Sequence, residues 1–135
     1  MFNIKNFDYI YDLIKKNKKI EAYQKLNSFR KQYSLHPDYL FLMANYLILD
    51  FRYYQSIDTI VASLKIDKDD MFLLKNDFEK SEEKLIVEKF NLLSYLFNMI
   101  DNKLLFNEIK NLKTLNEKNN FIKKLSKLMP GIRVR

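Results

Sequence analysis

The spacing of the apolar residues constrains this chain most, because they recur every three or four positions almost from end to end. That spacing lines up side chains on one face of an α-helix. The 135 residues include one glycine and two prolines, and neither Asn-Gly nor Asp-Gly occurs, although β-hairpins favour such turns. The sequence therefore predicts an all-α protein with a single domain.

Breaks in the apolar pattern predict about seven helices, joined in pairs by short turns. Pro37 should begin a helix, because proline disfavours a helical residue before it but fits the first turn. We expect the polar run 67–70 to end the fourth helix, Ser81 to cap the fifth, and Pro130 to end the last. Residues 71–80 fit either a short helix or a docked connector. The predicted helices cover about 6–16, 19–32 and 54–65, others that begin at Pro37, after Ser81 and after Asn102, and a last one at about 117–129.

The chain also repeats internally. The segment 3–36 aligns with the segment 37–70 without a gap. Each unit has the pattern of a helix, a turn and a second helix, and Asn17 aligns with Phe51 in the turn. A period of about 34 residues is typical of helical repeats that stack on one another and bury a shared core.

The second unit carries a specific pattern of large and small side chains. Its first helix has one small residue, Ala44, among large ones, and its second helix opens on an aromatic residue, Tyr53. This pattern resembles the tetratricopeptide repeat (TPR), in which small residues let paired helices approach closely. The matching positions are Leu40, Met43, Ala44 and Leu47 in the first helix, and Tyr53, Ser56, Ile60 and Ser63 in the second.

The chain departs from the TPR pattern in its turns and in its C-terminal half. The turn glycine of the family is Asn17 in the first unit and Phe51 in the second, and a third unit, with Ser94 at the small position, is degenerate. The resemblance implies a short right-handed α-solenoid of antiparallel helix pairs over residues 1–129. The expected order is repeats at about 3–36, 37–70 and 84–116, a C-terminal capping helix at 117–129 and a basic tail at 130–135.

The resemblance also implies a concave groove lined by the first helix of each unit. Its aromatic and apolar character favours a helix or an extended peptide as the partner. The expected function is a protein–protein interaction module: an adaptor, an assembly factor or a chaperone. The alternative is that the same aromatic residues form core with the chain's own C-terminal helix. The residues expected to line the groove are Phe7, Tyr11, Lys15, Phe41, Asn45, Leu49 and Tyr95, with Asn91 and Met99 as further candidates.

The net charge of +7 allows a second function. Lysine clusters can contact phosphates, RNA or an acidic protein, so the alternative is a structural subunit of a larger complex, such as a ribonucleoprotein. The charge is equally explained as solvated surface, since lysine and asparagine are common in chains encoded by AT-rich genes. The candidate contacts are Lys15, Lys16, Lys18 and Lys19 in one cluster, and Lys123, Lys124, Lys127, Arg133 and Arg135 in another.

The composition argues against chemistry at this chain's own side chains. There is no cysteine and one histidine, His36, which excludes disulfides and zinc sites built from several Cys or His ligands. A lone glycine cannot form a phosphate-binding loop or a dinucleotide fingerprint. We therefore expect no cofactor and no enzymatic activity. Every apolar run is too short for a membrane span, the N-terminus does not read as a signal peptide, and the lack of cysteine suits the cytoplasm or another reducing compartment.

Overall fold

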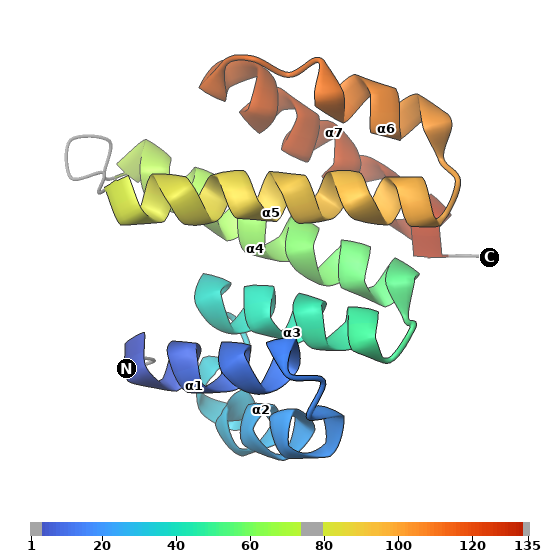
Figure 1. Ribbon diagram of the computed structural model, residues 1–135. Coiled ribbons are helices and arrows are strands. Elements are labelled where there is room, and N and C mark those ends of the chain that lie inside the picture. Colours follow the sequence, from blue (N-terminus) through green and yellow to red (C-terminus); the bar gives the residue numbers. More distant parts are fainter. Residues whose placement is uncertain (1–3, 74–79, 134–135) are drawn as a thin grey trace.

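The computed structural model describes residues 4–73 and 80–133, which form only helices and the turns between them (Figure 1). The prediction of an all-α protein is therefore confirmed over this part of the chain. The helices are α1 (Ile4–Lys15), α2 (Lys19–Tyr33), α3 (Pro37–Leu49), α4 (Tyr53–Leu73), α5 (Lys80–Met99), α6 (Lys103–Lys110) and α7 (Leu115–Arg133).

Three of the turns, those joining α1 to α2, α3 to α4 and α5 to α6, have the same backbone conformation. Asn17, Phe51 and Asp101 each have a φ angle of 59°, in the left-handed region. In the first turn the Lys18 N–H donates to the Leu13 carbonyl at 2.9 Å. The N–H of the left-handed residue, Asn17, donates to the Ile14 carbonyl at 3.0 Å. The same two bonds recur in the other turns. This is a Schellman motif, which satisfies the last carbonyls of a helix. Asn17 and Phe51, which align in sequence, therefore also have the same backbone conformation.

Among the described residues, helices α3 and α4 pack most extensively, and small side chains make their approach possible. Ala44 on α3 and Ser56 on α4 are fully buried. The Ser56 hydroxyl donates to the Ala44 carbonyl at 2.7 Å, and the Ser63 hydroxyl donates to the Pro37 carbonyl at 2.8 Å. Both serine hydroxyls thus find partners across the crossing, which removes the cost of burying them.

Helix α3 is shared by two apolar clusters, and it packs against α1, α2 and α4. One cluster joins it to α1 and α2. There the buried Tyr39 hydroxyl donates to the Leu26 carbonyl at 2.8 Å, and burial raises the pKa of Tyr39 to about 12. The other cluster joins α3 to the rest of the chain. The buried residues of α3 are Tyr39, Phe41, Leu42, Ala44, Tyr46 and Leu47.

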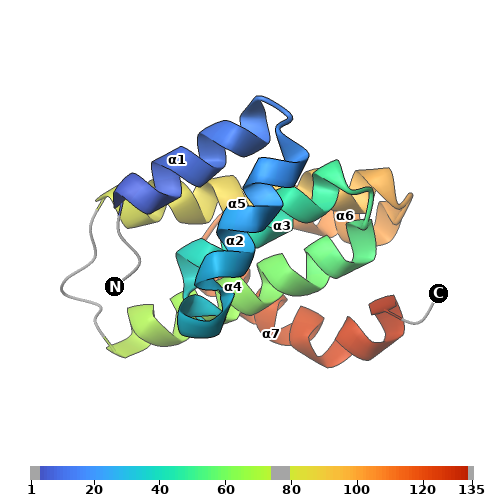
Figure 2. The same ribbon diagram turned by 90° about the horizontal axis from the view of Figure 1, so that it is seen from below.

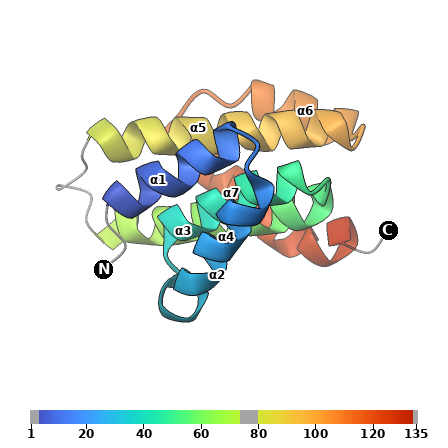
Figure 3. The same cartoon turned by 60° about the horizontal axis from the view of Figure 1, so that its bottom comes forward.

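The C-terminal helix α7 packs against α4. Figure 2 shows α1 and α5 on one side of the molecule, with α4 and α7 on the other, and Figure 3 shows α5 and α6 along one edge. Phe121, Ile122 and Leu125 of α7 are buried in the cluster that also contains the apolar face of α4. The C-terminal helix therefore extends the core on the side of α4.

Two helices run past the residues that were expected to end them. Helix α4 continues to Leu73, so the polar run 67–70 does not end it. Asp67 is instead fixed by an ion pair with α5, described below. Helix α7 continues to Arg133, less than one turn beyond Pro130. The fixed φ of proline is itself helical, so the proline can lie within the last turn.

The starts of α5 and α7 also differ from the prediction. Helix α5 begins at Lys80, so Ser81 is its second residue and not its cap. Helix α7 begins two residues earlier than expected, because Thr114 and Glu117 form a capping box. The Glu117 N–H donates to the Thr114 hydroxyl at 3.1 Å, and the Glu117 carboxylate accepts from the Thr114 N–H at 3.0 Å. These backbone hydrogen bonds lower the pKa of Glu117. The segment 71–80 was expected to be a short helix or a docked connector. Its residues 74–79 lie outside the described residues.

Enlarging Ala44 should disrupt the crossing of α3 and α4. We expect Ala44→Leu to lower the free energy of unfolding by about 1–3 kcal/mol, because the added atoms have no room in a filled core. The matched control is Ala62→Leu, at an exposed position of α4, which should change it by less than about 0.5 kcal/mol. Urea denaturation measures both. Equal effects of the two variants would contradict this packing.

Replacing Phe51 should stabilise the protein. A left-handed backbone costs about 1–2 kcal/mol for an ordinary residue, and asparagine tolerates it better. We expect Phe51→Asn to raise the free energy of unfolding by up to about 1 kcal/mol, measured by urea denaturation. For comparison, Gln24→Gly, at an exposed position in the middle of α2, should lower the free energy of unfolding by about 1 kcal/mol. A loss of stability in Phe51→Asn would show that the ring matters more to the fold than the backbone does.

Candidate partner-binding face

Three aromatic rings from α1 and α3 form a compact cluster on the α1 side of the molecule. The Phe7 and Phe41 rings stack at a centroid distance of 6.1 Å and an interplanar angle of 5°. Tyr11 packs against both, with centroid distances of 5.6 Å to Phe7 and 6.0 Å to Phe41. Phe7 and Tyr11 are four residues apart, so helical spacing puts them on the same face of α1. We call these three residues the aromatic face.

The aromatic face has a buried base and a partly exposed outer layer. Phe41 is 2% exposed, so it lies beneath the other two rings. Phe7 and Tyr11 are partly buried and pack against the cluster that contains Phe41. Two rings thus keep surface available for contact, while the third supports them. Ring pairs in this geometry contribute about 0.5–1.5 kcal/mol beyond area burial.

Charged groups of opposite sign act on Tyr11. The Lys15 ammonium is 4.5 Å from the centre of the Tyr11 ring, in a cation–π contact. Burial raises the pKa of the Tyr11 hydroxyl, and the negative charge of Glu88 on α5 raises it further. Glu88 is thus a charged group of α5 that acts on the Tyr11 hydroxyl.

Helix α5 carries the residues that the sequence predicted as further candidates for the groove. Asn91 and Tyr95 follow Glu88 at spacings of three and four residues, so the three share one stripe of the helix. Asn91 is exposed, Tyr95 is 48% exposed, and Met99, four residues further on, is 42% exposed. The stripe therefore carries polar and aromatic side chains that are exposed on α5.

The structure brings together some of the residues predicted to line a groove and separates others. Phe7, Tyr11, Lys15 and Phe41 make direct contacts. The Asn45 side chain donates to the Phe41 carbonyl within α3, at 2.8 Å. Leu49 is partly buried and packs into the cluster shared by α1, α2 and α3, and Tyr95 lies on α5.

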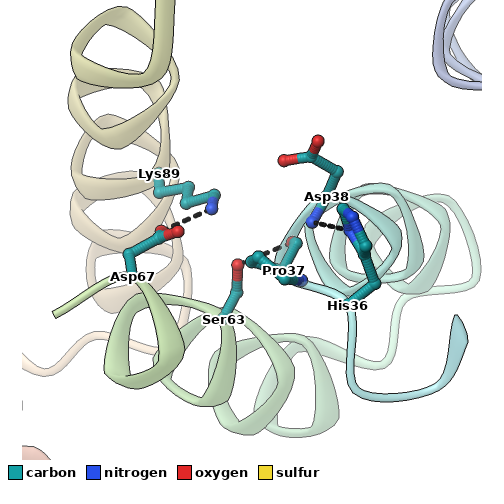
Figure 4. Close-up of polar contacts among 6 residues, drawn as sticks. All are labelled: His36, Pro37, Asp38, Ser63, Asp67 and Lys89. Atoms are coloured by element: carbon teal, nitrogen blue, oxygen red, sulfur yellow. Dashed lines mark hydrogen bonds and ion pairs between the residues drawn. The ribbon is translucent and has the colours of Figure 1, made fainter. Parts of the chain in front are cut away.

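Sequence reasoning missed a buried ion pair between α4 and α5. The Lys89 ammonium lies 2.5 Å from an Asp67 carboxylate oxygen, and its side chain is only 1% exposed (Figure 4). The two residues lie on different helices and far apart in sequence, so no helical spacing links them. A lysine inside an otherwise apolar stripe was the available signal, because a buried lysine requires a partner.

His36 has a structural contact at the start of α3. Its Nδ1 accepts the Asp38 N–H at 3.1 Å, which caps the helix (Figure 4). Close by, the Pro37 carbonyl accepts the Ser63 hydroxyl. The single histidine thus serves the junction between the two aligned units.

The predicted basic clusters are largely exposed and partly paired. Lys19 lies 2.5 Å and Arg52 2.7 Å from the Asp50 carboxylate. The hydrogen bond from Lys19 is the main cause of the lowered pKa of Asp50. Lys16 pairs with Asp12 at 3.0 Å, and Lys124 with Glu108 at 2.7 Å. Lys15, Lys18, Lys123 and Lys127 are exposed, whereas the Arg133 side chain and Arg135 lie outside the described residues.

Comparisons with protein families, with curated proteins and with solved structures give no match. Over the part of the chain that the structure describes, no group of three or more His, Cys, Asp or Glu side chains could hold a metal ion. No described helix is long and apolar enough to cross a membrane.

Removing one partner of the buried ion pair should destabilise the protein strongly. We expect Asp67→Asn to lower the free energy of unfolding by about 3–5 kcal/mol, because it leaves the Lys89 ammonium buried without an opposite charge. Adding Lys89→Met removes that charge and should restore most of the loss. As an exposed comparison, Lys124→Met should cost no more than about 1 kcal/mol. Thermal and urea denaturation measure all three, and a double variant as unstable as Asp67→Asn would refute this account.

Proposed function

We propose that this chain is a TPR-like helical solenoid that binds another protein. Three observations support the repeat. The same Schellman turn follows α1 and α3, at the aligned positions Asn17 and Phe51. Small residues lie at the crossing of α3 and α4, and α3 packs against both helices of the preceding pair. The third turn, at Asp101, follows at a longer spacing than the second does, because α4 and α5 are longer than the three helices before them.

The aromatic face is the binding surface in this proposal, and its layered burial is the observation that carries it. Phe7 and Tyr11 keep exposed surface above the buried Phe41. Helix α7 packs against α4, and Phe41 belongs to the same buried cluster as Phe121, Ile122 and Leu125 of α7. The alternative, in which the C-terminal helix forms core with the aromatic residues, therefore applies to Phe41, whereas Phe7 and Tyr11 are only partly buried.

The chemistry of the surface favours a short amphipathic helix or an extended segment as the partner. Aromatic residues dominate binding energy at interfaces, since they bury large areas at low entropic cost. Apolar burial contributes about 25 cal/mol per Å² before the costs of association. Lys15 and Glu88 give this surface charges of both signs, which the partner's own charges must match. The chain thus acts by binding, as an adaptor, assembly factor or chaperone.

Site-specific photocrosslinking in the native host tests this proposal. A photoreactive phenylalanine analogue at Tyr11 or at Tyr95 should capture a common partner protein. The same analogue at Tyr23, which is 45% exposed on α2, should not. Tyr11→Ala and Tyr95→Ala should each weaken capture by about tenfold, as for a residue worth about 1.4 kcal/mol at an interface.

A stability measurement separates binding from folding in this experiment. Phe41→Ala should lower the free energy of unfolding by about 3–5 kcal/mol, as for a buried ring. Tyr95→Ala, at an exposed position, should leave it within about 0.5 kcal/mol. Crosslinks of equal yield at Tyr23 and Tyr11, or none at Tyr11 and Tyr95, would remove the aromatic face from consideration.

A further inference from the structure

The three Schellman turns lie at one end of the molecule, on the right in Figure 1. We define the turn edge as residues 16–20, 50–53 and 101–104, which join α1 to α2, α3 to α4 and α5 to α6. It contains five basic and two acidic residues, a net charge of +3. About a tenth of the chain thus carries nearly half of its net charge of +7.

Each segment of the turn edge also exposes a large apolar side chain. Ile20 is 75% exposed, Phe51 is 76% exposed and Leu104 is 77% exposed. Ile20 and Leu104 occupy the same position, three residues after the left-handed residue of their turns. Among the described residues, the other large apolar side chain with comparable exposure is Leu35, at 79%. It precedes the N-terminus of α3, whereas Phe51 follows its C-terminus. The most exposed apolar residues are therefore concentrated where the positive charge is concentrated.

The stability of the fold does not explain why a phenylalanine occupies position 51. A bulky residue in the left-handed region is an outlier, where glycine or asparagine would cost less. With a ring 76% exposed, it gains little from burial, and its edge-on contact with Tyr53 has a centroid distance of 6.5 Å. We therefore infer that the Phe51 side chain makes a contact with another molecule.

Ion pairs hold part of the turn edge in place and leave part of its charge available. Lys19 and Arg52 share the Asp50 carboxylate, which ties the first turn to the second. Over the described residues, Lys18 and Lys103 make no ion pair. The edge thus combines a fixed frame with ammonium groups that can meet an external anion.

We propose that the turn edge docks on an anionic lipid surface. Ile20, Phe51 and Leu104 would enter the headgroup region, and the surrounding lysines would contact lipid phosphates. Apolar residues within a basic surface are the features that hold peripheral proteins at an interface, and each Lys or Arg near an anionic membrane adds attraction. Nucleic acid has the same charge but explains less, because Ile20 and Leu104 have no ring to stack on a base.

Sedimentation of the full chain with vesicles tests this inference. The chain should bind vesicles that contain phosphatidylserine and phosphatidylcholine, and not vesicles of phosphatidylcholine alone. Added NaCl should weaken binding. Lys18→Gln and Lys103→Gln should each reduce the partition coefficient about fivefold, whereas Lys31→Gln, near the opposite end of α2, should leave it unchanged.

The apolar variants separate docking from folding. Phe51→Asn should reduce vesicle binding about tenfold while leaving the protein as stable as before or more so, since asparagine suits the left-handed turn. Ile20→Ser with Leu104→Ser should reduce binding further, and Leu35→Ser should not reduce it. An absence of binding to anionic vesicles overturns the proposal, as does binding that Phe51→Asn does not change. Binding of single-stranded RNA, sensitive to the same variants, without vesicle binding would assign the edge to nucleic acid instead.

Discussion

The close approach of α3 to α4 is the constraint on which the rest of the structure depends. Ala44 lets the two helices meet, and the Ser56 hydroxyl closes the crossing with a hydrogen bond to the Ala44 carbonyl. Helix α3 can then present Tyr39 and Leu42 to α1 and α2 while Phe41 faces the opposite cluster. A larger side chain at the crossing would separate α4 from α3, and with it α5 and α7, which pack on α4.

The turns show how helix pairs form in a chain that has almost no glycine. Asn17 and Asp101 are short polar residues, which tolerate the left-handed conformation. Phe51 has no such advantage, yet its turn makes the same hydrogen bonds as the other two. The packing of α3 on α4 is extensive enough to hold Phe51 in a strained conformation, in line with the view that tertiary context overrides local preference. A strained residue that is also exposed points to a contact outside the fold.

Local patterns predicted the helices and the turns, because helix periodicity and turn chemistry are set by neighbouring residues. They could not predict that α4 runs through its aspartates, since Asp67 is held by Lys89 of the following helix. They placed Phe41 on a lining surface, where the structure puts it beneath Phe7 and Tyr11. The burial of Phe41 depends on how α1 crosses α3, and the sequence of a single helix does not determine that crossing. The packing of α7 against α4 was missed for the same reason.

The aromatic face and the turn edge use different parts of the same helices. Tyr11 and Tyr95 project from the sides of α1 and α5, whereas Ile20, Phe51 and Leu104 lie beside the turns at the helix ends. Lys15 marks the boundary, because it is the last residue of α1 and already contacts the Tyr11 ring. Contact at the helix ends leaves the helix sides accessible, so a chain docked through its turns can still bind a partner. The two surfaces are therefore compatible in one molecule, and each depends on residues that the other does not use.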